Sequence, residues 1–180
     1  VLPVNTKTVH RLYDYSKYTE EDVRVPTMEE YFDICNRNGC VAFIELKEDK
    51  GVIEAMINAI EKYGMQDRCV ISSGNLALLE AYRAAGGKEV IHLIFAKPEQ
   101  IRRVQELGNA SVSFKYSDLS AEVDLNIEGV RIKSFSQLVD HMHALGIRIC
   151  FRAADTQEDA LKMIEYGTDY MPSNVKTTIE

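Results

Sequence analysis

The sequence predicts an α/β fold of the parallel (β/α) type, the TIM barrel. Short apolar runs of strand length alternate with amphipathic helices, and such alternation is typical of parallel strands joined by helical crossovers. Successive strands also begin about 21 to 36 residues apart, which is comparable to the ~31 residues per unit of an eightfold barrel of about 250 residues. A doubly wound sheet is the structural alternative, but no glycine-rich phosphate loop follows any predicted strand.

The predicted elements follow one another along the chain. Thr27 and Glu30 form a capping-box pattern that opens a helix ending near Asn36. Further helices are predicted over residues 51–62, 76–85, 98–107, 134–145 and 156–166, and strands over 41–47, 68–72, 89–95, 111–115, 148–152 and 168–171. The segment 116–133 holds either an extra strand or an irregular loop.

The sequence therefore predicts about six of the eight strands of a barrel. We expect residues 1–180 to form a single barrel domain that lacks its N-terminal part, because two further units would bring the length near the ~250 residues of a closed barrel. An open barrel exposes strand edges near residues 41–47 and 168–171. We expect either upstream chain or an oligomeric partner to cover these edges.

Composition narrows the classes of function. The chain has 28 acidic and 21 basic residues, a formal net charge of −7, which disfavours sequence-independent binding of nucleic acid. No stretch approaches the ~18 apolar residues of a membrane span, so we expect a water-soluble chain. The first residues lack a signal-peptide pattern; secretion or periplasmic export with the signal removed, and a cytoplasmic location, all stay open. The four cysteines lack CxxC spacing and are expected to be reduced.

Glu45 and Lys47 are the strongest candidates for a functional site. They lie two residues apart on one predicted strand, so they share a face with Phe43, while the apolar Ala42 and Leu46 take the other face. Because ligands bind beyond the carboxyl ends of parallel strands, Glu45 is a candidate ligand of a hard cation and Lys47 a candidate phosphate-binding cation. The alternative is that the two charges neutralise each other or lie at a solvated rim.

Polar residues also end several other predicted strands. Hydroxyl groups and cations that converge on one rim suit an anionic ligand such as a phosphoester. The candidates for phosphate binding are Ser72, Lys115 and Arg152, and Ser73, Lys97, Ser113, Ser173 and Asn174 occupy similar places.

The histidines do not form a recognisable catalytic group. His141 and His143 lie two apart on a predicted helix, so they point in nearly opposite directions. His92 is interpreted as a core histidine, and His10 has unspecific surroundings. No nucleophilic triad is legible.

An ordered set of motifs resembles the glycerophosphodiester phosphodiesterases. Val25-Pro-Thr-Met-Glu-Glu-Tyr-Phe is similar to that family's Ile-Pro-Thr-Leu-Glu-Glu segment, and Phe43-Ile-Glu-Leu-Lys47 to its Ile-Glu-Leu-Lys strand. The resemblance continues through Val70-Ile-Ser-Ser73, Asp155-Thr-Gln-Glu-Asp159 and Gly167-Thr-Asp169, and covers residues 1–171.

This resemblance implies a TIM barrel that hydrolyses glycerophosphodiesters to an alcohol and glycerol 3-phosphate, with Ca²⁺ or Mg²⁺ as the cofactor and a place in lipid metabolism. It also implies that Glu45 is a metal ligand and that Lys47 contacts phosphate. Such chemistry is physically consistent, because a divalent cation neutralises the phosphodiester while acid and base groups move protons.

The chain also departs from the family pattern. The family's first His-Arg pair and its Glu-x-Asp metal pair belong to strands that would precede residue 1. Its His-Asp pair is expected near Pro3-Val-Asn-Thr-Lys-Thr-Val-His-Arg11, where His10 is displaced, and Arg152 stands near the place of its late Trp. No catalytic role is therefore assigned to any residue, and we expect residues 1–180 alone to hydrolyse these substrates poorly.

Two other functions stay open. One is a non-catalytic barrel that binds phosphoglycerol-containing ligands or a protein partner through the same mouth. The other is an unrelated phosphate-binding barrel enzyme, such as an isomerase or aldolase.

Overall fold

The structure is a computed structural model that describes residues 19, 24–116, 119, 121–151 and 154–174. The chain divides into two compact units, residues 1–40 and 41–180. His10 and Arg152, which the sequence analysis singled out, lie outside the described residues.

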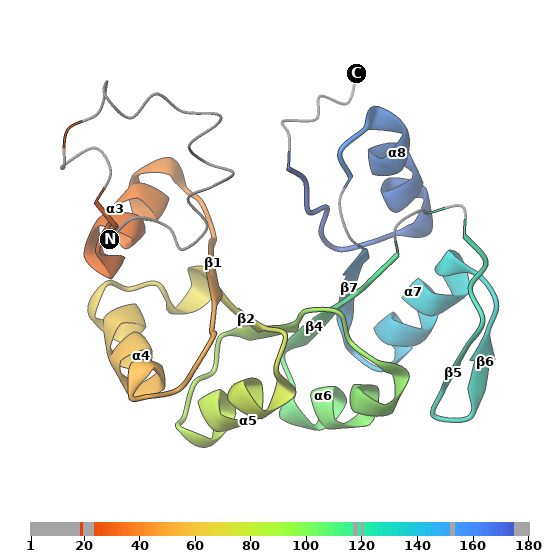
Figure 1. The fold of residues 1–180 in the computed structure, drawn as a ribbon, viewed down its shortest axis with the longest axis horizontal. Coiled ribbons are helices and arrows are strands. Elements are labelled where there is room, and N and C mark those ends of the chain that lie inside the picture. Colours follow the sequence, from red (N-terminus) through yellow and green to blue (C-terminus); the bar gives the residue numbers. More distant parts are fainter. Residues whose placement is uncertain (1–18, 20–23, 117–118, 120, 152–153, 175–180) are drawn as a thin grey trace. The chain divides into compact units, whose positions relative to one another are not determined.

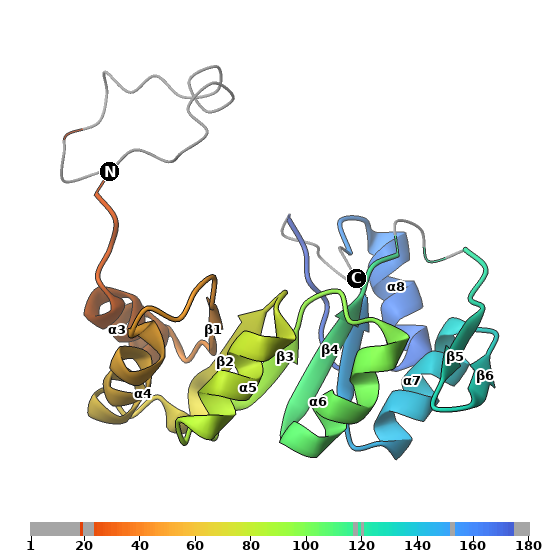
Figure 2. The same ribbon diagram turned by 60° about the horizontal axis from the view of Figure 1, so that its bottom comes forward.

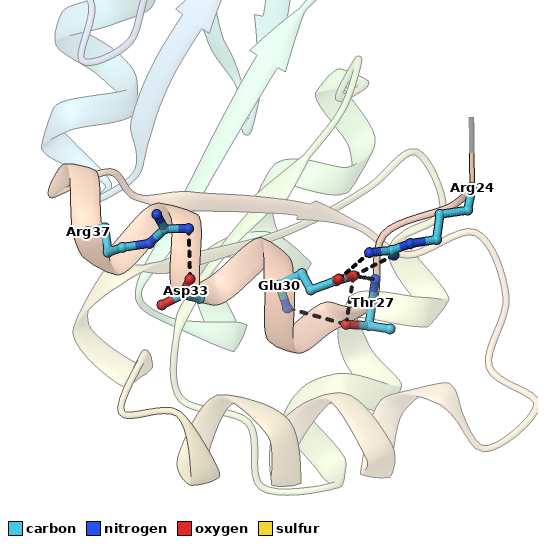
Figure 3. A network of polar contacts seen from close by, with 5 residues as sticks. All are labelled: Arg24, Thr27, Glu30, Asp33 and Arg37. Carbon is cyan, nitrogen blue, oxygen red and sulfur yellow. Dashed lines mark hydrogen bonds and ion pairs between the residues drawn. The ribbon is translucent and has the colours of Figure 1, made fainter. Parts of the chain in front are cut away.

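Helix α3, Met28–Asn38, is the helix that the structure describes in the first unit, and it begins at the predicted capping box. The Thr27 hydroxyl accepts a hydrogen bond from the backbone N–H of Glu30, and the Glu30 carboxylate accepts one from the backbone N–H of Thr27 (Figure 3). Arg24 donates to both carboxylate oxygens of Glu30, which lowers the pKa of Glu30 to about 2. One turn further, Arg37 pairs with Asp33 at 2.8 Å.

The second unit is built on a five-stranded parallel sheet. Its strands are β1 (Ala42–Glu45), β2 (Cys69–Ser73), β3 (Val90–Leu93), β4 (Ala110–Phe114) and β7 (Arg148–Phe151), in the order β1-β2-β3-β4-β7. The order of the strands across the sheet is thus the same as their order along the chain. A doubly wound sheet reverses its strand order, so this progression is that of the singly wound barrel type. Among the described strands, β1 and β7 are edges and the barrel is open.

Helices connect the strands and lie along one side of the sheet, as Figures 1 and 2 show for α4 to α7. They are α4 (Val52–Lys62), α5 (Leu76–Ala84), α6 (Ile101–Leu107), α7 (Phe135–Ala144) and α8 (Gln157–Tyr166), with 3₁₀ turns at η2 (Gln66–Arg68) and η3 (Pro98–Gln100). Five of the predicted helices are confirmed to within two residues at either end, and the helix predicted over 98–107 is the 3₁₀ turn η3 followed by α6. In α4 the buried side chains are Ile53, Met56 and Ile60.

The two faces of the sheet differ in chemistry. On the helix-covered face, Ala42, Ile71 and Val112 are fully buried or nearly so. On the opposite face, the strand register places Glu45 beside Ser72, Ser72 beside His92, and His92 beside Ser111. Paired residues of neighbouring strands point to the same side, so a polar row crosses this face, which we call the inner face.

One sequence prediction needs correction, and one open alternative is decided. The predicted last strand at 168–171 is absent from the described residues, which contain five parallel strands and not six. The segment 116–133 holds an antiparallel hairpin, β5 (Leu125–Ile127) and β6 (Val130–Ile132). Its turn uses Glu128 and Gly129 at φ 52° and 84°, the left-handed pair that a two-residue hairpin turn requires.

All four cysteines are free thiols, as predicted. Within the part of the chain that the structure describes, no helix has the length and apolar character needed to cross a membrane.

Candidate functional site

Glu45 and Lys47 lie at the carboxyl end of β1, and the predicted division of faces is correct. Ala42 and Leu46 are buried on the helix side, whereas Phe43 and Glu45 lie on the inner face. Lys47 Nζ donates a hydrogen bond to Glu45 Oε1. The side chains of Glu45 and Lys47 are 42% and 74% exposed, so this is a solvated ion pair in which the charges offset each other.

Ser72 lies beside Glu45 in the register, but its hydroxyl is engaged. It is almost fully buried, and its Oγ donates to the carbonyl of Ile44 at 3.1 Å. Ser73 does the same one residue further, donating to the carbonyl of Leu46 at 2.9 Å. Both hydroxyls therefore hold β1 against β2, and a phosphate at this edge would compete with the Ile44 carbonyl for the Ser72 proton.

Lys115 is exposed at the carboxyl end of β4. Its Nζ lies 5.9 Å from the ring centroid of Phe95, which follows β3. Phe95 adopts a positive φ of 55°, and its backbone N–H donates to Ser113 Oγ at 3.1 Å. Glu45 ends β1 and Lys115 directly follows β4. Both residues lie at the carboxyl edge of the sheet, and strands β2 and β3 lie between β1 and β4.

A cavity of about 700 Å³ opens on the inner face, and we call it the inner cavity. Its volume is within the range typical of small-molecule sites. Its walls are mainly apolar, formed by Phe43, Ile94, Phe95, Met171 and Pro172, and its polar lining residues are His92, Ser113, Cys150, Asp169 and Tyr170.

His92 is the central polar side chain of the inner cavity. It is 4% exposed, its Nδ1 lies 2.8 Å from Ser111 Oγ, and its ring packs edge-on against Phe43 at a centroid distance of 5.3 Å. Burial lowers the pKa of His92 to about 4, so the imidazole is neutral at pH 7. The prediction of a core histidine is confirmed, but the sequence did not indicate that this histidine faces a cavity.

Residues 167–174 run beside β7, and residues 169–172 of this segment line the inner cavity. The backbone N–H of Asp169 donates to the carbonyl of Ile149, and Asp169 Oδ2 accepts from the backbone N–H of Ile149 at 2.8 Å and lies 2.9 Å from His143 Nε2. Further on, Asn174 binds the carboxylate of Asp155 through its backbone N–H and its side-chain amide. These bonds seat the segment beside β7, although it is not a strand.

The expected metal site is incomplete in what the structure describes. Across the described residues, no three His, Cys, Asp or Glu side chains are grouped so that they could hold a metal ion. Glu45 is a single carboxylate and is paired with Lys47. Ca²⁺ takes six or more oxygen ligands, so Glu45 supplies only part of a site for the ion.

Comparison with solved structures shows what this arrangement resembles. A candidate glycerophosphoryl diester phosphodiesterase from Silicibacter pomeroyi DSS-3 superposes with a TM-score of 0.63 at 20% identity, covering 83% of this chain and 53% of that one. A candidate glycerophosphodiester phosphodiesterase from Galdieria sulphuraria superposes with a TM-score of 0.67 at 20% identity, covering 90% of this chain and 66% of that one.

The chain shares the fold of these proteins. It spans between about half and two thirds of their length. No protein-family model and no curated protein matches the chain. The two structures carry the same family name as the one that the sequence motifs resemble.

Proposed function

We propose that the carboxyl edge of the sheet binds glycerophosphodiesters, and that the chain takes part in their metal-dependent hydrolysis to an alcohol and glycerol 3-phosphate. The observation that carries the proposal is that Glu45 and Lys47, from the segment that resembles the family strand, lie together at the ligand-binding edge of the matching fold. Lys47 and Lys115 would hold the phosphate, and Glu45 would supply one ligand to Ca²⁺ or Mg²⁺.

Hydrolysis by residues 1–180 alone is expected to be weak. Among the described residues, Glu45 is not part of a group of three or more side chains that could hold the metal, and the buried neutral His92 is no general acid at pH 7. We expect glycerol 3-phosphate release from glycerophosphocholine to stay near background with either cation. Release of glycerol 3-phosphate that depends on Ca²⁺ or Mg²⁺ and reaches many turnovers per chain would contradict the expectation of weak hydrolysis. It would support the proposal that the chain is an active phosphodiesterase.

A non-catalytic binding role is the second candidate, favoured by the neutralised Glu45–Lys47 pair. Calorimetry with glycerol 3-phosphate tests this role. Detectable binding supports it, and absence of binding contradicts it. We expect Lys47→Ala to weaken that binding, and Lys50→Ala, which removes a similar ion-paired lysine beyond the strand, to leave it unchanged. Equal effects of the two substitutions would show that the carboxyl edge is not the binding site.

The cation ligand is tested by Glu45→Gln. Removing the charge while keeping the shape is expected to weaken Ca²⁺ binding about tenfold, or ~1.4 kcal/mol. Glu48→Gln is the matched control, because Glu48 is also exposed and paired with a lysine two residues later, at 2.6 Å from Lys50 Nζ. Isothermal titration calorimetry measures the Ca²⁺ affinity of both variants. An unchanged Ca²⁺ affinity of Glu45→Gln would show that Glu45 is a solvated carboxylate at the rim and not a metal ligand.

A further inference from the structure

The C-terminal end of α3 brings two cysteines of the first unit close together. Gly39 follows the helix with a left-handed backbone, at φ 64° and ψ 24°. The backbone N–H of Cys40 donates to the carbonyl of Cys35 at 2.9 Å, and the N–H of Gly39 donates to the carbonyl of Asn36 at 3.3 Å. These two hydrogen bonds define the Schellman motif, in which the side chain after the glycine frequently contacts the side chain five residues earlier. In this chain both of those residues are cysteines.

The first of these hydrogen bonds also limits how far apart the two cysteines lie. Cys40 Cα is ~1.5 Å from its own nitrogen, and Cys35 Cα is ~2.4 Å from its own carbonyl oxygen. Because that nitrogen and that oxygen are 2.9 Å apart, the two Cα atoms are separated by at most about 6.8 Å. Disulfides join Cα atoms that are about 4.4–6.8 Å apart, so the pair does not exceed the span that a disulfide bridges.

The two thiols differ in their access to solvent. Cys40 is exposed, whereas Cys35 is 4% exposed. The Cys40 thiol lies against the last residue of α3, because its Sγ donates to the carbonyl of Asn38 at 3.7 Å. Cysteines that react with peroxide are often accessible and lie next to a second cysteine that resolves the oxidised sulfur. Cys40 and Cys35 match these two roles.

The other two cysteines of the chain do not form such a pair. Cys69 lies on β2 and Cys150 on β7, and β3 and β4 separate these strands in the sheet. Neighbouring strands lie ~4.8 Å apart, so the two residues are roughly 14 Å apart along the sheet, about twice the span of a disulfide. Both side chains are buried, and burial raises the pKa of the Cys150 thiol to about 12, which disfavours its reactive thiolate. Cys69 and Cys150 therefore serve as internal controls.

We propose that Cys35 and Cys40 are a redox site at which hydrogen peroxide closes a disulfide across the end of α3. The Cys40 thiolate attacks the peroxide, releases hydroxide and becomes a sulfenic acid. The Cys35 thiol then attacks the Cys40 sulfur, so that the S–S bond forms, the S–O bond breaks and water leaves. Overall, the two thiols lose two electrons and two protons, and one peroxide is reduced to two waters. The disulfide closes a ring over residues 35–40, just before β1, the strand that ends at Glu45.

The test treats the full chain with hydrogen peroxide and then identifies the thiols that remain. The reduced chain has four free cysteines, so N-ethylmaleimide added after denaturation should label four thiols before oxidation and two after it. Trypsin locates the bond, because it cleaves after Arg24, Arg37 and Lys47. Without reduction, the intramolecular disulfide joins peptide 25–37 to peptide 38–47, whereas a bond between two chains through Cys40 joins two copies of 38–47.

Three variants assign the roles of the two thiols. Cys40→Ser should abolish the disulfide and leave the other three thiols reduced. Cys35→Ala should stop the reaction at the Cys40 sulfenic acid, which dimedone traps. Cys69→Ala is the matched control, because it removes a buried cysteine of β2 and should leave the linked peptides unchanged. If Cys35→Ala does not fold, the unmodified chain and Cys40→Ser still decide the question.

The contribution of the fold is measured at equilibrium in a glutathione buffer. We expect the equilibrium constant for the Cys35–Cys40 disulfide to be about tenfold larger in the folded chain than in concentrated urea. The reason is that the helix end already holds the two ends of the ring close together, whereas the unfolded chain must lose entropy to close it.

Three results would overturn the proposal. Four labelled thiols after peroxide treatment would show that the pair does not react. Cross-linked copies of peptide 38–47, or a sulfinic acid on Cys40 beside a reduced Cys35, would show that Cys35 does not resolve the oxidised sulfur. Equal equilibrium constants in the folded and unfolded chain would show that the end of α3 does not hold the two thiols together. None of these readouts involves glycerol 3-phosphate or a metal, so failure here is distinct from failure of the proposed hydrolysis.

Discussion

Gly87→Ala is expected to lower the free energy of unfolding by about 2–3 kcal/mol, because overpacking of this kind distorts a rigid core. A methyl group at Gly87 would lie 2.2 Å from Tyr82 Cε1 and 2.3 Å from Cζ, well inside contact distance. Either the ring or the backbone must then move.

Neither part of this contact moves easily. Tyr82 is fully buried, and its hydroxyl donates to the carboxylate of Glu89, which also accepts from the backbone N–H of Lys88 at 3.0 Å. The backbone of Gly87 is held by a bond from its N–H to the carbonyl of Tyr82 and by Arg83, which donates to its carbonyl at 2.9 Å. The strain therefore spreads to a hydrogen-bonded network.

Gly74→Ala is the matched control for this experiment. A Cβ at Gly74 has nothing within 4 Å, and the residue has no positive φ. Urea unfolding of both variants should separate them clearly. A loss for Gly87→Ala no larger than that for Gly74→Ala would show that Tyr82 relaxes freely. A double-mutant cycle with Tyr82→Ala should in turn be strongly non-additive, because the smaller side chain removes the clash.

Phe151→Ala is expected to cost about 3–5 kcal/mol, the range for truncating a buried phenylalanine. Phe151 ends β7 on the helix side and is fully buried. Its ring packs edge-on against Phe135 of α7 at a centroid distance of 5.0 Å and against Tyr116 at 6.0 Å. Phe135 in turn stacks on Tyr166 of α8, so four rings join the sheet to two helices.

The comparison with Phe151→Leu isolates the cost of the cavity. Leucine keeps most of the buried volume but not the ring contacts, so a smaller loss of roughly 1–1.5 kcal/mol is expected. Chemical unfolding followed by near-ultraviolet circular dichroism measures both variants, because the tyrosine signal reports on the cluster. A loss under ~1 kcal/mol for Phe151→Ala would show that the cluster collapses to fill the space.

Local sequence predicted the helices well because their signals lie within a few residues. Thr27, Ser134 and Thr156 each cap a helix by accepting a backbone N–H from three residues later. The hairpin of β5 and β6 was missed although its signal was present: Gly129 in the turn is flanked by alternating apolar residues, Leu125 and Ile127 before it and Val130 and Ile132 after it.

The alternation of strands and helices in the sequence by itself determined the fold class, the positions of most elements and the inner placement of Glu45. Only the tertiary structure decided which residues meet across strands. The register joins His92 to Ser111, and two hydrogen bonds between Asp169 and Ile149 seat the segment near 168–171 beside β7 without a strand. Helical caps depend on neighbours in the chain, whereas strand pairing and cavities depend on contacts between distant residues, which no local pattern encodes.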